Sequence, residues 1–222
     1  MAQISKDTFK FLKELAANND REWFMANKPR YEEIRNAYVH FIGEMIDRIA
    51  VFDDSVAGLD PKKCVMRIYR DVRFSKDKTP YNVHISGHIV AGGRKNEHGR
   101  AGYYVRLEDG KSMLAGGAYL PPSPWMTAIR KEIETNADEL RSIVGTASFK
   151  KYFGEIEGEK LKTAPKGYPR DHPEIELLRY KSLLAVHQCS NKQVMAADFV
   201  DYAQEVFHAL HPFDAFLNRS GN

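Results

Sequence analysis

Apolar side chains recur at intervals of three and four residues between Tyr31 and Ile49, the strongest periodicity in this chain. This spacing places the side chains on one face of a helix, because an α-helix completes a turn every ~3.6 residues. Pro29 suits the first turn of that helix, where its missing N–H costs nothing. The pattern predicts a long amphipathic helix with one face on a core. The apolar positions are Tyr31, Ile34, Tyr38, Phe41, Met45 and Ile49.

The middle of the chain has the period of two that is typical of β-strands. Apolar and polar residues alternate in 64–69 and in 82–89, and two further strand-like segments follow at 101–107 and 112–120. The last two segments are joined at Asp109-Gly110, and Asp-Gly is a strong β-hairpin signal. Consecutive strands with short connections favour antiparallel pairing. We therefore predict an α+β fold rather than a doubly wound parallel sheet.

Helical patterns precede and follow these strands. Pro124 suits the first turn of a helix that starts near Ser123, residues 180–189 alternate like a strand, and 197–210 has the period of a closing helix. We predict a single domain over residues 1–222, in which a mainly antiparallel sheet is flanked by N-terminal and C-terminal helices. Its parts are a helical front at 5–50, a sheet core at 63–120, and a helical and strand back at 122–218.

Composition narrows the class of protein. The chain has 222 residues, of which 43% are hydrophobic, and a formal net charge of +3, so it can bury a core but carries no large basic excess. Its cysteines, Cys64 and Cys189, lack the CxxC spacing of a thiolate metal site. The N-terminus has no apolar signal-peptide core, and no apolar run reaches transmembrane length. We therefore expect a soluble, reduced, cytoplasmic protein with no membrane partner.

No sequence motif specifies a cofactor or a metal ion. A phosphate-binding P-loop, a dinucleotide fingerprint, a serine nucleophile elbow and an HExxH zinc motif are absent from the sequence. A metal cluster could be read from Asp171, His172, Glu174 and Glu176. The start of a helix explains the same residues, because Pro173 suits the first helical position and the helix dipole favours carboxylates in the first turn. We therefore predict no cofactor and no metal site. Whether the protein is an enzyme built from scattered residues stays open.

A basic segment at 67–81 separates the first two predicted strands. It is longer than a plain hairpin requires, and long loops between rigid strands concentrate binding residues. The planar guanidinium group of arginine can donate two parallel hydrogen bonds to a pair of carboxylate or phosphate oxygens, and lysine adds a mobile positive charge. Our first hypothesis is a pocket here for a small anionic ligand, phosphorylated or carboxylated. The predicted ligand-binding residues are Arg67, Arg70, Arg73, Ser75, Lys76, Lys78, Tyr81 and His84.

The sequence does not specify catalytic residues, but it offers one candidate. If the protein is an enzyme, His84 is the residue for proton transfer, with Arg67 and Arg73 stabilising developing negative charge. This role requires that the strand face with Arg67 and Tyr69 coincide with the face that carries His84 and His88. The two histidines are four residues apart on a strand, about 13 Å at ~3.3 Å per residue, which is too far to bind one metal ion unaided.

Two alternatives for the basic segment stay open. Basic residues interleaved with Tyr69, Phe74 and Tyr81 suit phosphate contacts and base stacking in a nucleic-acid-binding protein, although the small net charge argues against extensive phosphate contact. In the other alternative, Asp71 and Asp77 pair with the arginines and lock the segment onto the front helices, which makes its role purely structural.

Three stretches together resemble a known family. They are Asn18-Asn-Asp-Arg-Glu-Trp-Phe24 with Asn27-Lys28, the basic segment 67–81, and Asp171-His-Pro173 with Leu177-Leu-Arg-Tyr-Lys181. In this order they are similar to the uncharacterised family catalogued as domain of unknown function 2461, and the likeness spans nearly the whole chain. The resemblance implies a single-domain protein found in bacteria and fungi, and it supplies no catalytic residue. Neither the residues nor the resemblance specifies a substrate or an oligomeric state.

Overall fold

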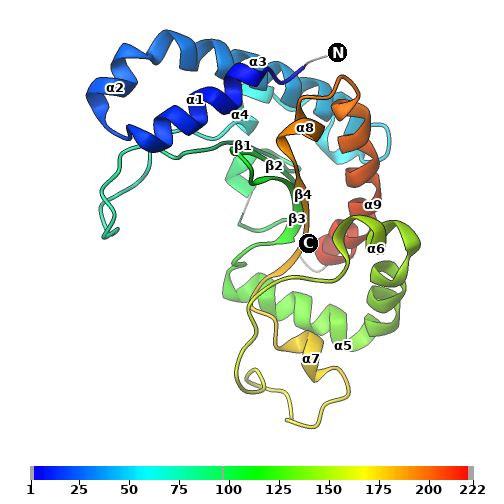
Figure 1. Ribbon diagram of the computed structural model, residues 1–222. Coiled ribbons are helices and arrows are strands. Elements are labelled where there is room, and N and C mark those ends of the chain that lie inside the picture. The colour runs from blue at the N-terminus through cyan, green and yellow to red at the C-terminus, as the bar shows by residue number, and fades with distance from the viewer. Residues whose placement is uncertain (1–2, 97, 220–222) are drawn as a thin grey trace.

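The computed structural model describes residues 3–96 and 98–219 and places helices at both ends of a central sheet (Figure 1). The front holds α1 (Lys6–Ala17), α2 (Arg21–Ala26), α3 (Lys28–Ile49), the 3-10 helix η1 (Asp54–Val56) and α4 (Pro61–Cys64). The strands are β1 (Ile85–Ile89), β2 (Tyr103–Leu107), β3 (Ser112–Ala118) and β4 (Leu183–Cys189), with the 3-10 helix η2 (Arg94–Asn96) after β1. The back holds α5 (Ser123–Gly145), α6 (Ala147–Phe153), α7 (Ile175–Leu178), α8 (Asn191–Val194) and α9 (Phe199–Arg219).

The strands β1 to β4 form one antiparallel sheet in the order β1-β2-β3-β4. Strand β4 lies beside β3, although α5, α6 and α7 separate the two in the chain. Helix α3 packs on β1 and helix α9 packs on β3. Gly87 permits the close approach of α3, because a Cβ atom there would lie 2.9 Å from Cδ1 of Ile42. The α+β class with flanking helices is confirmed.

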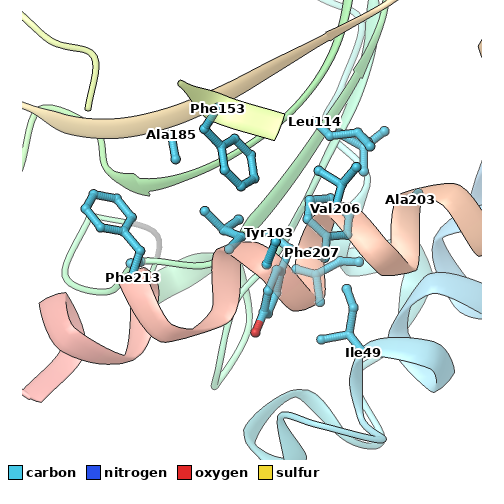
Figure 2. Packing of buried hydrophobic residues seen from close by; sticks show 14 of the residues in the cluster. Ile49, Tyr103, Leu114, Phe153, Ala185, Ala203, Val206, Phe207 and Phe213 are labelled. Atoms are coloured by element: carbon cyan, nitrogen blue, oxygen red, sulfur yellow. The ribbon is translucent and has the colours of Figure 1, made fainter. Parts of the chain in front are cut away.

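The main hydrophobic core lies between the sheet and the helices (Figure 2). Tyr103 and Leu114 of the sheet meet Val206 and Phe207 of α9, and Ile49 at the end of α3 belongs to the same cluster. All the apolar positions predicted for the long helix are buried. The predicted helix is therefore confirmed as α3, and its apolar face does pack on a core.

A second, smaller hydrophobic cluster joins the front helices to the basic segment. Ile68 and Tyr81 lie near the two ends of that segment, and both are buried in this cluster. The front helices therefore hold the base of the basic segment. The members of the cluster are Phe11, Leu12, Leu15, Phe24, Tyr31, Ile34, Ile68 and Tyr81.

The strand predicted at 64–69 is wrong. Only Cys64 of this segment is helical, as the last residue of α4, which begins at Pro61 where Asp60 accepts a capping hydrogen bond from the Lys62 N–H at 3.0 Å. After α4 the chain makes isolated β-bridges rather than a continuous ladder. The next predicted strand is confirmed in its second half, since β1 begins at Ile85.

Most other predicted elements are confirmed. The segments at 101–107, 112–120 and 180–189 contain β2, β3 and β4, and the closing helix is α9. The helix start predicted near Pro173 leads to α7, which has only four residues. Within the described ranges, we find no helix that combines the length and the apolar character needed to cross a bilayer.

Candidate anion-binding site

The middle of the basic segment, residues 70–80, forms an arm that extends from the body as the blue-green loop beside α1 and α2 (Figure 1). A short ladder closes the base of the arm. The Arg70 N–H donates to the Pro80 carbonyl at 2.9 Å, and the Asn82 N–H donates to the Ile68 carbonyl at 2.7 Å. The arm is thus a hairpin-like excursion from the edge of the sheet.

Tyr81 anchors the arm to the front helices. Its ring stacks on that of Phe24 with the centroids 4.0 Å apart. The Asn19 amide completes the anchor, because it donates to the Tyr81 carbonyl at 2.9 Å and accepts from the Tyr81 N–H at 3.1 Å. Tyr81 is only 3% exposed. Its side chain is therefore part of the fold and does not present a surface to a ligand.

The arginines of the arm are paired within the arm itself. Arg70 donates to the Asp77 carboxylate at 2.7 Å and also contacts the carbonyl and hydroxyl groups of Thr79. Arg73 forms a two-pronged pair with Asp71, at 2.9 Å from Nε and 2.6 Å from Nη2. Asp71 and Asp77 do pair with arginines, as one alternative predicted, but the pairs shape the arm rather than lock it onto the helices.

The same pairs change the acidity of the two carboxyl groups. The side-chain hydrogen bond from Arg73 lowers the pKa of Asp71 to about 2. The Thr79 backbone N–H, followed by the Arg70 side chain, lowers the pKa of Asp77 to about 2. Both aspartates therefore stay ionised near neutral pH and cancel part of the positive charge of the arm.

The remaining polar residues of the arm do not converge on a pocket. The Lys78 ammonium group donates to the Val72 carbonyl at 2.9 Å. The Ser75 backbone N–H also donates to Val72, at 3.3 Å, and Lys76 is exposed. None of these side chains lines the groove described next.

A groove of about 570 Å³ lies between α3 and the chain that follows α4. Arg67 is the one predicted ligand-binding residue that lines this groove among the described residues. Tyr69, which is 50% exposed, forms part of the wall beside it. The other charged and aromatic residues of the lining are Lys28, Tyr31, Glu32, Arg35 and Arg94.

The charges of the groove are predominantly positive. Lys28 lies 3.7 Å from Glu32, and Arg94 donates to the Val65 carbonyl at 3.4 Å. Arg35 and Arg67, in contrast, make no side-chain hydrogen bond or ion pair within residues 3–96 and 98–219. Arginine planes that lack an acidic partner are well suited to carboxylate or phosphate oxygens.

His84 lies away from this groove. Ser86 of β1 donates to the sulfur of Met66 at 3.3 Å, whereas Gly87 faces α3. His84 lies just before β1 and is not on the lining of the groove, whereas Arg67 is. The groove therefore does not bring Arg67 and His84 together.

The surroundings of His84 form a small polar cluster on the sheet. Its Nδ1 lies 4.0 Å from the carboxylate of Glu108, which also pairs with Arg106. Burial, and then the charge of Arg106, lower the pKa of His84, while Glu108 acts in the opposite direction. His84 is therefore largely neutral at neutral pH and separate from the arm's cations.

Sequence reasoning missed Arg35 and Arg94. A signal for Arg35 was present, because it follows Tyr31 and Lys28 by four and seven residues and so shares their helix face. Arg94 lies in η2, beyond β1, and its approach to the groove has no local signature.

The stretch near α7 has ordinary structural roles. His172 Nδ1 accepts from the Glu174 N–H at 3.0 Å, Glu174 pairs with Arg141, and Glu176 pairs with Lys160 at 3.1 Å. Among the residues that the structure describes, no three His, Cys, Asp or Glu side chains are arranged to hold a metal ion.

The family model for conserved hypothetical proteins named DUF2461 matches residues 7–216. The chain belongs to the DUF2461 family. The arm, the groove and its cations all lie within the matched part of this DUF2461 chain. No curated protein and no solved structure gives a significant match. The description of the DUF2461 family names no activity, so function has to be inferred from the site.

Proposed function

We propose that the protein binds a small anionic ligand, phosphorylated or carboxylated, in the groove between α3 and Arg67. The observation that carries this proposal is the pair Arg35 and Arg67, two arginines on the lining of a groove of about 570 Å³ without an ion pair among the described residues. Lys28 and Arg94 add positive charge at the same groove. An anion that accepts hydrogen bonds from both arginines would supply the acidic partner that each of them lacks.

The groove supports this proposal better than the arm does. Arg70 and Arg73 already have carboxylate partners, so an anion bound there would compete with Asp77 and Asp71. Arg67 has no such competitor among the described residues. The proposed ligand-binding site is therefore the groove at the base of the arm rather than the arm itself.

Nucleic-acid binding is the second candidate, and Phe74 is the observation in its favour. Its ring is 95% exposed, and the Arg73 guanidinium lies 5.9 Å from the ring centroid. Tyr81, however, is buried and cannot stack on a base. With part of the arm's charge cancelled and a net charge of +3, this candidate has less support.

No reaction is part of the proposal. His84 does not line the groove, so proton transfer by His84 to a ligand bound there has no geometric support. A cytoplasmic location belongs to the proposal, and the free state of both cysteines, Cys64 and Cys189, is compatible with a reducing compartment.

Calorimetric titration with inorganic phosphate, pyrophosphate, a nucleoside monophosphate and succinate tests the proposal. We expect at least one anion to bind the wild-type protein, and Arg35→Ala and Arg67→Ala to weaken that binding at least tenfold. Arg73→Ala is the matched control, because it removes an arginine that already has a partner. Equal affinities in all three variants, or no binding of any of these anions, would reject the groove.

A single-stranded oligonucleotide, titrated at low and high salt, separates the two candidates. Contacts with several phosphates weaken steeply with salt, whereas a pocket for one small anion loses less affinity. Strong, salt-sensitive oligonucleotide binding that Phe74→Ala and Arg73→Ala remove would favour the nucleic-acid candidate instead.

A further inference from the structure

A second pocket, of about 240 Å³, lies where α9 meets the sheet and η1. It shares no lining residue with the groove beside α3. Its volume is far above the ~10–15 Å³ that one water molecule needs. The groups on its lining that carry charge or proton-transfer chemistry include Asp53, Arg100, Tyr103, His211 and Asp214.

Asp214 is the unusual residue of this pocket. It is only 3% exposed, and neither carboxyl oxygen makes a hydrogen bond of normal geometry among the described residues, although the Gly117 backbone N–H lies close enough to lower its pKa. The backbone of β3 leaves it little room, since a Cβ atom at Gly116 would lie 2.8 Å from Oδ2 of Asp214. Buried polar groups are nearly always hydrogen-bonded, so this carboxyl group is an acceptor that a bound molecule can satisfy.

The floor of the pocket is a connected polar network. The Tyr103 hydroxyl lies 2.9 Å from Oδ2 of Asp53 and 2.8 Å from Nδ1 of His211. All three groups are satisfied when Tyr103 donates to Asp53 and His211 Nδ1–H donates to the Tyr103 oxygen. Figure 2 shows the Tyr103 ring among the apolar side chains, with its hydroxyl oxygen directed away from them. The network thus places the polar groups of Tyr103, Asp53 and His211 at the edge of the main core.

Arg100 supplies the opposite charge. It lies on the lining of the pocket, and its Nε is buried without a hydrogen-bond partner within residues 3–96 and 98–219. The pocket therefore presents a buried donor on a cation and a buried acceptor on a carboxyl group. A ligand that satisfies both must offer an acceptor to Arg100 and a donor to Asp214, and a carboxylate and an ammonium group on one molecule do this most strongly because both hydrogen bonds are then charge-assisted.

We infer that this pocket binds a small zwitterion of the α-amino acid class. The ligand's ammonium group faces the carboxyl groups of Asp214 and Asp53, and its carboxylate faces Arg100. The Tyr103 hydroxyl oxygen, fixed by Asp53 and His211, accepts a further hydrogen bond from the ammonium group. This inference uses residues separate from the groove and holds whether or not the groove binds an anion.

Binding of the ammonium group should change the protonation of Asp214. Burial raises the pKa of Asp214 well above the ordinary value, the Gly117 backbone N–H opposes this, and the nearby charge of Asp53 adds a smaller rise. A cation placed beside Asp214 lowers its raised pKa and favours its ionised form, so binding of the ammonium group shifts the carboxyl group towards release of its proton to the buffer.

Calorimetric titration of the full chain with glycine, L-alanine and L-serine tests the inference, with methylamine and acetate as probes of a single charge. We expect a zwitterion to bind at least tenfold more tightly than either single-charge probe. We also expect the binding heat to depend on the ionisation enthalpy of the buffer, because a proton is released. Failure of all three amino acids to bind at about 10 mM would overturn the inference, and ordered water would then be what satisfies these atoms.

Variants identify the site. Asp214→Asn and Arg100→Ala should each reduce amino-acid binding at least tenfold, while Arg67→Ala in the other groove should leave it unchanged. If Asp214→Asn does not fold, Asp53→Asn and Arg100→Ala report on the same pocket from its two ends. Amino-acid binding that survives both of these substitutions would overturn the assignment to this pocket.

Discussion

The rings of Phe24 and Tyr81 stack with their centroids 4.0 Å apart and their planes inclined by 20°. Phe24 lies on α2 and Tyr81 closes the base of the arm, so this contact helps to join the helical front to the arm. Tyr69 packs edge-on against Phe24 at 6.0 Å and also lines the groove. The position of the groove wall therefore depends on an aromatic contact outside the groove.

Phe24→Ala should lower the free energy of unfolding by about 3–5 kcal/mol, the usual cost of deleting a buried phenylalanine ring. Phe24 is fully buried in the small front cluster, where few neighbours can move to fill the space. Urea denaturation measures the change. Phe74→Ala is the control, because Phe74 is 95% exposed and its loss should leave stability nearly unchanged. Equal effects of the two substitutions would contradict the anchoring role of Phe24.

Arg70→Ala should lower the melting temperature by roughly 2–4 °C, since Arg70 holds both Asp77 and the Thr79 backbone and is the less exposed of the two arginines. Arg73→Ala should leave it essentially unchanged, because its pair with Asp71 is exposed and local. Differential scanning calorimetry of both variants checks the ranking. A large loss with Arg73→Ala would instead favour a structural lock at Asp71.

Asp214→Asn should make the protein more stable at neutral pH, and the gain should grow with pH. An unfolded aspartate ionises above about pH 3.9, while the buried carboxyl group keeps its proton to a higher pH because burial raises its pKa. The unfolded state is therefore favoured increasingly as pH rises from about 4, and an asparagine removes this effect. Urea denaturation of both proteins at pH 4 and pH 7 measures the difference.

Asp53, His211 and Arg100 line the same pocket as Asp214. They are common to both proteins, so the difference between variant and wild type isolates Asp214. Loss of stability in the variant at both pH values would mean that the carboxyl group has a structural role.

Cys64 and Cys189 should resist thiol reagents in the folded protein. Burial raises the pKa of Cys64 to about 11 and that of Cys189 to about 12, and the thiolate is the reactive form. Reaction with a chromogenic disulfide at pH 8 should therefore be slow in buffer and rapid in denaturant. Rapid labelling of the folded protein would show that one of these sites opens readily.

Local patterns in the sequence were sufficient to predict several helices and strands. The period of three and four from Tyr31 to Ile49 predicted α3, and Asp109-Gly110 predicted the β2–β3 hairpin. Both signals depend on residues close in the chain, where periodicity reports directly on which face is buried. The same reasoning failed at 64–69, where Cys64 ends α4 and the rest of the segment makes only isolated β-bridges.

The candidate sites show the same difference between contacts that a local pattern predicts and contacts that it does not. The pairs Arg73–Asp71 and Arg70–Asp77 join residues two and seven apart, and the composition of the segment was enough to suggest them. The meeting of Arg35 with Arg67, and of Asp214 with Asp53, could not be read from any local pattern. Helical and strand periods specify which face of an element is apolar, but they do not specify which partner covers it. Which polar side chains end up together, and which of them are left without a partner, depends on how α3 and α9 pack against the sheet.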